Sequence, residues 1–449
     1  CMAIAYGCTD SLALNFDPLA NTDDGFCCGA SLPIPFGTQI GMDIDGEVAG
    51  DRSGYSVSLS SDGNTVAIGA HRNDGNGTDA GHVRIYENIS GSWTQIGNDI
   101  DGEAAGDMNG YSVSLSGDGN TVAIGANLND GNGSESGHVR IYENIVGSWS
   151  QIGQDIDGET AASQSGWSVS LSSDGSTVAI GALRNDGNGY EAGHVRIYEN
   201  IVGSWSQIGQ DIDGETAGDK TGYSVSLSSD GNTVAIGAPE NDGNGPGAGH
   251  TRVYEYNGST WVQLGQDIDG ESAGDQSGSS ISLSSDGNTI AIGAYANSGN
   301  GLSSGHVRIF NYNGSLWNQL GNDIDGVAAH DWTGCSVSLN SDGNSVAIGA
   351  YGNDATSSQA GHVRTFSWDS TSWVQYGVDI NGEAGNNYSG FSVSMNSDGN
   401  TLAIGAPHNA GNGTKSGHVR VFSVGDSQTS PPCSGCTDSL AVNYDPYSL

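Results

Sequence analysis

The segment from Asp62 to Ala70 recurs along the chain at a constant interval of 56 residues. Its aspartate returns at positions 118, 174, 230, 286, 342 and 398, without one insertion or deletion between copies. A period of this length exceeds the ~33–47 residues of helical-pair repeats and lies nearer the ~40–50 residues of propeller blades. The repeat therefore predicts seven equal structural units that together account for most of the 449 residues.

Each repeat alternates polar and apolar residues with a period of two, which indicates strands rather than helices. In the second unit, the strand-like segments are 111–115, 121–125, 138–142 and 149–153. An Asp-Gly pair at 118–119 suits a tight hairpin between the first two strands. Four strands in each of seven repeats predict an all-β fold, a seven-bladed β-propeller. The alternative is an open β-solenoid, which the constant spacing and the count of seven disfavour.

The two ends of the repeated region are complementary. In the last unit, Thr429 occupies the position that tryptophan has in the other repeats, so we expect this unit to lack its fourth strand. One repeat length before the first tryptophan lies Gly37, and the sequence from Gln39 to Gly46 matches that from Gln95 to Gly102. We therefore expect 36–44 to supply the outer strand of the seventh blade, which would pair an otherwise free edge. The predicted domains are a Cys-rich module at 1–30, the propeller at 36–424, and a linker with a truncated second module at 425–449.

The repeat resembles a known family. The run Gly-Tyr-Ser-Val-Ser-Leu at 110–115, followed by Val-Ala-Ile-Gly-Ala and Gly-His-Val-Arg-Ile-Tyr, is similar to the FG-GAP repeat of the integrin α-subunit propeller and its microbial relatives. Gly390-Phe-Ser-Val-Ser with Ala403-Ile-Gly-Ala-Pro407 is the nearest copy to that pattern. The chain departs from the family where a long Asp-rich calcium loop joins the first two strands. Here that loop is reduced to Ser-Asp-Gly-Asn-Thr, so the resemblance implies the fold without this calcium site.

Six of the seven cysteines lie outside the repeats. Gly7-Cys-Thr-Asp-Ser-Leu-Ala-Leu-Asn-Phe-Asp-Pro18 reappears at 435–446, and it resembles a Cys-bounded module of secreted and surface proteins of marine microbes. Such a short module needs a staple, for which Cys8 and Cys27 are the obvious pair, while Cys28 and Cys433 are candidates to link the termini. Their clustering indicates an oxidising, extracellular location. Cys335 lies in a strand register and is expected to be an unpaired core residue.

Where the chain begins and ends also led to expectations. A chain that starts at Cys1 is expected to be mature or an excerpt, with lipidation of Cys1 as an alternative. The truncated second module indicates a piece of a longer protein in which modules and propellers alternate.

The net charge of −40 limits the possible partners. A surface of this sign repels phosphate backbones and anionic lipid heads, so we expect no nucleic-acid binding. The absence of an apolar run of about 18 residues also argues against membrane insertion. The expected partners are like modules or other extracellular proteins, with glycans as a further class.

Two acidic loops recur in each blade and are expected on the same rim of the ring. Oxygen ligands at alternate positions, with glycine for sharp turns, are what calcium requires. The alternative is that these side chains bind loop N–H groups as Asx turns. The candidate calcium ligands of the rim are Asp45, Glu47, Asp51, Asp101, Glu103, Asp107, Asp213, Glu215, Asp219, Asp269, Glu271 and Asp275. A second set, in the Cys-rich module, comprises Asp17, Asn21, Asp23 and Asp24.

A Gly-His-x-Arg motif occurs once in every repeat. The two side chains lie on the same side of a strand, because they are two residues apart. Seven equivalent histidines separated by the ring cannot converge on one substrate, so we interpret the set as structural, with each arginine paired to a loop carboxylate. The members are His82, Arg84, His138, Arg140, His194, Arg196, His250, Arg252, His306, Arg308, His362, Arg364, His418 and Arg420.

No motif for a catalytic nucleophile, a phosphate loop or a zinc site is present, so we expect no enzyme. Seven Asn-x-Ser/Thr sequons are candidates for glycosylation in a eukaryotic host, although chance matches are expected in so Ser- and Asn-rich a chain. They begin at Asn76, Asn88, Asn132, Asn257, Asn313, Asn387 and Asn412.

The sequence predicts an extracellular or cell-surface module for structure or adhesion, a building block of a surface or filamentous assembly. The alternative is a carbohydrate-binding, lectin-type propeller. For that function the aromatic candidates on the loops are Tyr190, Tyr295, Trp332 and Tyr351.

Overall fold

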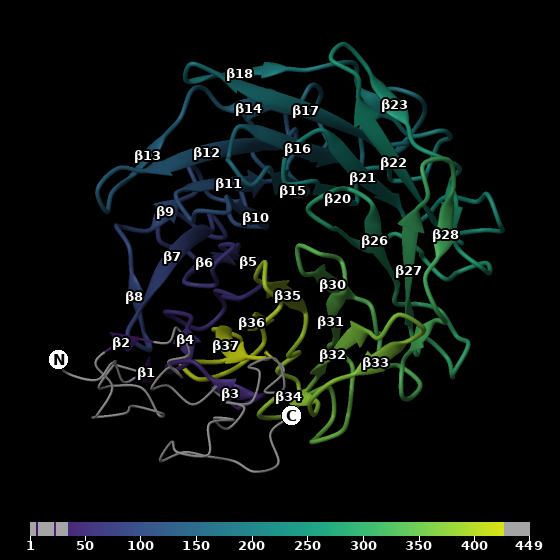
Figure 1. Ribbon diagram of the computed structural model, residues 1–449. Coiled ribbons are helices and arrows are strands. Elements are labelled where there is room, and N and C mark those ends of the chain that lie inside the picture. The colour runs from purple at the N-terminus through teal and green to yellow at the C-terminus, as the bar shows by residue number, and fades with distance from the viewer. Residues whose placement is uncertain (1–5, 8–21, 24–34, 426–449) are drawn as a thin grey trace.

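The computed structural model describes residues 6–7, 22–23 and 35–425. Within these residues the secondary structure consists of strands alone. Seven sheets stand around a central axis like the blades of a propeller (Figure 1). The predicted fold class is therefore confirmed, and the solenoid alternative is wrong because the last sheet returns to the first.

The strands of each blade follow one another from the axis outwards. The innermost strands are β5 (Ser56–Leu59), β10 (Ser112–Leu115), β15 (Ser168–Leu171), β20 (Ser224–Leu227), β25 (Ser280–Leu283), β30 (Ser336–Leu339) and β35 (Ser392–Met395). The second strands are β6 (Thr65–Ala70), β11 (Thr121–Ala126), β16 (Thr177–Ala182), β21 (Thr233–Ala238), β26 (Thr289–Ala294), β31 (Ser345–Ala350) and β36 (Thr401–Ala406).

The third strands carry the Gly-His-x-Arg motif at their start. They are β7 (His82–Ile89), β12 (His138–Asn144), β17 (His194–Ile201), β22 (His250–Tyr256), β27 (His306–Tyr312), β32 (His362–Trp368) and β37 (His418–Ser423). The outer strands are β8 (Ser92–Gln95), β13 (Trp149–Gln151), β18 (Ser204–Gln207), β23 (Trp261–Gln263), β28 (Trp317–Gln319), β33 (Trp373–Gln375) and, for the seventh blade, β3 (Thr38–Gln39).

Each blade has a short fifth strand that the sequence did not predict. These strands are β9 (Ile100–Asp101), β14 (Ile156–Asp157), β19 (Ile212–Asp213), β24 (Ile268–Asp269), β29 (Ile324–Asp325), β34 (Ile380–Asn381) and β4 (Ile44–Asp45). In the first blade the outer strand pairs only as far as Tyr86, which leaves the first residues of β7 without a partner on that side. Ile100 and Asp101 return to pair with Val83 and His82, and so satisfy backbone groups that would otherwise be unpaired.

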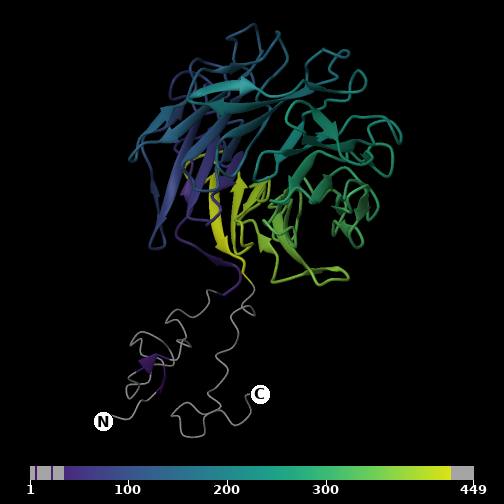
Figure 2. The same cartoon turned by 45° about the horizontal axis from the view of Figure 1, so that its top comes forward.

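The N-terminal segment closes the ring as expected. β3 pairs with β37 through Thr38 and Ser423, and the Gly37 N–H donates to the Ser423 carbonyl at 2.8 Å. Phe36 packs edge-on against Tyr376, with 5.8 Å between the ring centroids. Figure 2 shows β3 in purple beside β37 in yellow, at one edge of the disc. The first and last residues of the propeller are thus neighbours.

The hydrophobic core lies between blades rather than at the centre. One cluster joins Ala67, Val83 and Ile85 of the first blade to Val122 and Ile124 of the second, and all five are at most 1% exposed. A corresponding cluster joins each neighbouring pair, including the seventh blade and the first. Burying a side chain of this kind contributes roughly 1.5–3 kcal/mol, so each blade is stabilised mainly by its neighbours.

The propeller has two different faces. The hairpin face carries the turns between first and second strands, such as 60–64. The loop face carries the two recurring acidic loops, such as 71–81 and 98–110, which are joined by a hydrogen bond from the Gly102 N–H to the Gly81 carbonyl at 2.8 Å. The predicted placement of both acidic loops on one rim therefore agrees with the structure.

The terminal modules lie mostly outside the described residues. This applies to Cys8, Cys27, Cys28 and Cys433 and to the calcium candidates Asp17, Asn21 and Asp24. Asp23 belongs to β2 (Thr22–Asp23), which pairs in parallel with β1 (Tyr6–Gly7). The disulfide pairings stay predictions.

Candidate functional site

The histidine and arginine of each third strand face the junction with the preceding blade. His82 and Arg84 are 1% and 7% exposed. The Arg84 Nη2 donates to the Asp45 carbonyl at 2.7 Å, and its Nη1 lies 3.7 Å from Glu47 Oε1. The arginine therefore joins its own blade to the loop of the previous one.

This junction repeats around the ring with one exception. The arginine–glutamate pairs are Arg84–Glu47, Arg140–Glu103, Arg196–Glu159, Arg252–Glu215, Arg308–Glu271 and Arg420–Glu383, at 3.6–3.9 Å. Arg364 lacks such a partner because Val327 stands at the corresponding position. In all seven blades the guanidinium also lies over the aromatic ring two residues on, at 5.1–5.7 Å from the centroid.

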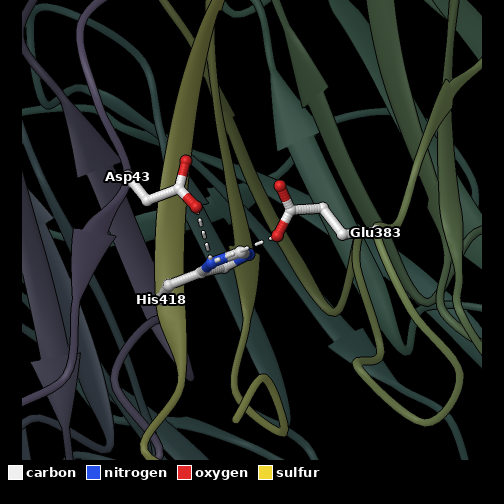
Figure 3. A group of neighbouring side chains, drawn as sticks. All are labelled: Asp43, Glu383 and His418. Carbon is white, nitrogen blue, oxygen red and sulfur yellow. Dashed lines mark ion pairs between the residues drawn. The ribbon is translucent and has the colours of Figure 1, made fainter. Parts of the chain in front are cut away.

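The histidine adds two carboxylates to the junction (Figure 3). His418 Nδ1 lies 3.5 Å from Asp43 Oδ2 and 4.0 Å from Glu383 Oε2. Burial and the charge of Arg420 together lower the pKa of His418 to about 4, although Asp43 opposes both. The imidazole is therefore neutral near pH 7, so the junction is held by hydrogen bonding and by the arginine charge.

A histidine with two carboxylates is also a possible metal-ligand set. Such groups recur at Glu47–His82–Asp99, Glu103–His138–Asp155, Glu159–His194–Asp211 and Glu215–His250–Asp267, with ligand atoms within 4.8 Å of one another. A neutral imidazole suits zinc or copper better than calcium, which prefers oxygen ligands. However, the guanidinium beside each glutamate already supplies the positive charge that a cation would bring. We therefore interpret these groups as structural junctions.

The structure gives the predicted calcium ligands of one loop three different surroundings. Asp107 is buried, and its Oδ2 accepts hydrogen bonds from the Ala104 N–H at 2.9 Å and from Asn129 Nδ2 at 3.1 Å. Glu103 is paired with Arg140, and Asp101 is exposed at the end of the short strand β9. The loop aspartate thus does what the Asx-turn alternative expects. Equivalent bonds to loop N–H groups are made by Asp51, Asp219 and Asp275.

The remaining calcium candidates follow the same pattern. Glu47, Glu215 and Glu271 are paired with arginines. Partial burial, with a smaller contribution from a neighbouring aspartate, raises the pKa of each aspartate in the short fifth strands, namely Asp45, Asp101, Asp213 and Asp269. Calcium binding at this rim stays a prediction.

Several sequon asparagines already use their amide nitrogen. Asn76, Asn132 and Asn412 donate through Nδ2 to the carbonyls of Gly102, Gly158 and Gly46, at 2.7–2.9 Å. Asn257 donates to Thr260, whereas the Oδ1 atoms of Asn88 and Asn313 accept backbone N–H groups in exposed turns. Asn387 is only 6% exposed. The expectation of an exposed glycosylation loop is therefore wrong for Asn387, because folding buries it.

Aromatic side chains gather around the axis on the loop face. Tyr55 contacts Tyr111 at 5.0 Å and Phe391 at 4.8 Å, and Tyr111 contacts Trp167 at 4.7 Å, between ring centroids. These residues directly precede the innermost strands, and Tyr223 continues the series. We call the set Tyr55, Tyr111, Trp167, Tyr223 and Phe391 the aromatic ring.

Cys335 occupies the same register as the aromatic ring. It is a free cysteine, and it is half-buried rather than part of the core between blades. Its Sγ donates to the Gly390 carbonyl at 3.4 Å. The sequence register was read correctly, but it marks the axis of the propeller instead of its core.

The four aromatic candidates for sugar binding are not all together. Trp332 stacks at a tilt on Tyr351 at 4.9 Å, and Tyr351 contacts Phe391 at 5.4 Å, so both extend the aromatic ring. Tyr295 is half-buried on the same face. Tyr190 is 72% exposed on a separate loop. The sequence pointed to all four residues as irregularly placed candidates, and it gave no sign that the fold brings Trp332 and Tyr351 into contact.

The family comparison agrees with this architecture. The FG-GAP repeat matches residues 44–86 and 100–142, which run from a short fifth strand to the aromatic residue of the next third strand. The chain carries FG-GAP repeats. No curated protein matches it. FG-GAP repeats are typical of extracellular proteins and commonly form protein-interaction modules. In the described part of this FG-GAP propeller, no helix is long and apolar enough to cross a membrane.

Proposed function

We propose that this FG-GAP propeller acts outside the cell by contact rather than by chemistry, as a building block of a surface or filamentous assembly. The observation that carries the proposal is the position of its ends. Pro35 and Gly425 bound a closed disc whose first and last strands pair directly, so both tethers leave at one place. The partner would bind on the loop face.

The rigidity of the disc supports this role. The Ser Oγ of each innermost strand accepts the leucine or methionine N–H of the adjacent blade at 2.9–3.0 Å, in all seven junctions. The seven buried histidines are separated by the blades and already face carboxylates or arginines. They therefore serve the junctions better than a single reaction centre. The partners we propose are like modules, other extracellular proteins or glycans.

Electron microscopy of the full chain, with and without reductant, tests the assembly role. We expect strings or clusters of discs that separate when reductant and chelator are combined, because the terminal cysteines would link neighbours. The variant Cys335→Ser serves as a control and should assemble normally. A protein that stays monomeric at all concentrations and hydrolyses a glycan or ester would contradict the proposal.

A lectin-type function is a second candidate. The observation that favours it is the aromatic surface on the loop face, where Trp332 and Tyr351 join the aromatic ring. Aromatic side chains combine an apolar face with polar handles, which suits the faces and hydroxyl groups of sugars.

A further inference from the structure

In the part of the chain that the structure describes, four basic side chains of this acidic protein have no carboxylate within 4.0 Å, and three of them lie outside the Gly-His-x-Arg motif. The chain has 12 lysines and arginines against 52 acidic residues. Eight of the basic residues have a carboxylate within 4.0 Å, namely Arg84, Arg140, Arg184, Arg196, Lys220, Arg252, Arg308 and Arg420. Arg364 is accounted for by Val327. Within the described residues, Arg52, Arg72 and Lys415 form no ion pair.

These three residues meet at one place, the junction of the seventh and first blades on the loop face. Arg52 lies in the loop before β5, and its N–H donates to the Lys415 carbonyl at 3.1 Å. Arg72 directly follows β6, and its N–H donates to the Asp51 carbonyl at 3.4 Å. The charge of Arg72 acts on Arg52, and the charges of Lys415 and Arg52 both act on His408. Loops from both blades thus bring three positive charges near one another, with Lys415 on the exposed side, although the acidic composition would make carboxylate partners easy to find.

The two guanidinium groups are not relieved by their surroundings. Both side chains are half-buried, and the Nε of Arg72 is buried without a hydrogen-bond partner. Burial lowers the pKa of Arg52, and the charge of Arg72 lowers it further, while Tyr55 and Asp79 oppose these effects only in part. Like charges held together away from water cost free energy unless an anion compensates them.

Neutral polar and aromatic groups surround the charges. Tyr55 lies 4.1 Å from His71, and Tyr388 stacks on His408 at 4.3 Å, between ring centroids. His71 is 2% exposed, and its Nδ1 has no hydrogen-bond partner. Burial, together with the charges of Arg52 and Arg72, lowers the pKa of His71 to about 3, so its ring is neutral. An unpaired buried nitrogen is costly, and a ligand hydroxyl or carboxylate would satisfy it.

We propose that Arg52, Arg72 and Lys415, with His71 and Tyr388, form a binding site for the carboxylate of an acidic saccharide such as a uronic-acid oligomer. Guanidinium groups bind carboxylates through two parallel hydrogen bonds. The adjoining rings of Tyr388, Tyr55 and Phe391 offer planes for the sugar, and His71 offers a hydrogen bond. The site takes a short segment, because the acidic loops around it repel a long polyanion at separations below about 8 Å.

Saccharide binding at this site rests on the loop face being free, as the proposed contact function also does, but it does not require assembly.

The repeat supplies a matched control residue. Arg184 occupies the position of Arg72 two blades further on, yet it is paired with Glu191 at 3.7 Å. Substituting Arg184 therefore removes the same charge from the same register without touching the three unpaired residues.

The test is isothermal titration of the full chain with trigalacturonate and with its methyl ester, which is neutral. We expect the acid form to bind and the ester to bind at least about tenfold more weakly, since a charged hydrogen bond contributes about this factor or more. Arg52→Met and Arg72→Met should each weaken binding about tenfold or more, whereas Arg184→Met should leave it unchanged. Neither Arg52→Met nor Arg72→Met should lower the melting temperature, because each removes repulsion.

Several results would overturn the site. These are no binding of trigalacturonate at millimolar concentration, equal binding of its ester, and an equal loss in Arg184→Met. Tighter binding of a tri-aspartate peptide would replace the saccharide by an acidic peptide. Assembly measured by light scattering on the same variants separates the two proposals, because loss of saccharide binding with assembly intact leaves the contact function standing.

Discussion

The backbone N–H of Ser397 in the seventh blade donates to the carbonyl oxygen of Ser61 in the first blade, at 3.0 Å. This bond completes a continuous ring on the hairpin face, in which each first turn donates to the corresponding turn of the next blade. The ring runs through Ser61, Gly117, Ser173, Ser229, Ser285, Ser341 and Ser397, with distances of 2.7–3.0 Å. No blade can leave without breaking two of these bonds, so closure is a property of the whole circle.

Removing residues 1–44 should therefore destabilise the entire propeller. The deletion removes β3, the packing of Phe36 on Tyr376, and the buried Ile44, and leaves the edge of β37 unpaired. An unpaired strand edge recruits other chains. We expect a lower melting temperature and aggregation, measured by calorimetry and size-exclusion chromatography with light scattering.

Deletion of residues 1–34 provides the control, because it leaves the described propeller complete. This shorter deletion should keep the melting temperature of the full chain. If the deletion to residue 44 gave an equally stable monomer, β3 would be dispensable for closure.

Stability should fall as the pH is lowered from about 6.5 toward 4. Burial lowers the pKa of His138, His194 and His250 from 6.5 to about 4 in the folded protein. Between these values the unfolded chain takes up protons that the folded protein does not, so acid favours unfolding, and the contribution of the histidines to stability is constant above this window. Each histidine contributes up to about 3 kcal/mol by this mechanism.

Denaturant titrations at pH 7.5, 6 and 5 measure this slope. His194→Asn should flatten the slope by the share of one histidine, and His138→Asn with His194→Asn by the share of two. A free energy of unfolding that stays constant between pH 7.5 and 5 would show that the histidines take up protons in the folded protein as readily as in the unfolded chain.

The repeat made most of the fold predictable, because every blade obeys the same alternation and the same junction. The two-residue fifth strands escaped prediction, since an Ile-Asp pair such as Ile100–Asp101 is too short to show alternation. The unpaired charges escaped for the opposite reason. Arg52, Arg72 and Lys415 belong to no position that is basic in every blade, so a comparison of the repeats by register hides them. Without the seven repeated arginines, only five basic residues remain in the sequence. That three of these five meet at one junction depends on ring closure, which the sequence does not show directly.

The arginine of a junction should matter far more than its glutamate. Arg196 is 7% exposed, donates to the Asp157 carbonyl at 2.7 Å and lies over Tyr198. Arg196→Met removes this charged hydrogen bond and the contact with the Tyr198 ring, and should cost about 3 kcal/mol of unfolding free energy. The side chain of Glu159 is 42% exposed, so Glu159→Val should cost about 1 kcal/mol or less.

The junction of the fifth and sixth blades is a natural precedent for the second substitution, since Val327 occupies the position that the glutamate has at the other junctions. Denaturant titration of both variants measures the difference. Equal losses would mean that the ion pair, rather than the arginine's hydrogen bond and packing, holds the junction.

Cys335 should react slowly with thiol reagents and should stay outside any disulfide. Burial raises the pKa of its thiol to about 11, so the reactive thiolate is scarce at pH 8. Its Sγ is also engaged with the Gly390 carbonyl. Labelling with iodoacetamide at pH 8 should be slow in the native protein and fast in denaturant, and Cys335→Ser should abolish that slow label. Peptide mapping without reductant completes the measurement. A cross-link between Cys335 and another cysteine would contradict its place at the axis, because the six other cysteines lie outside the propeller sequence.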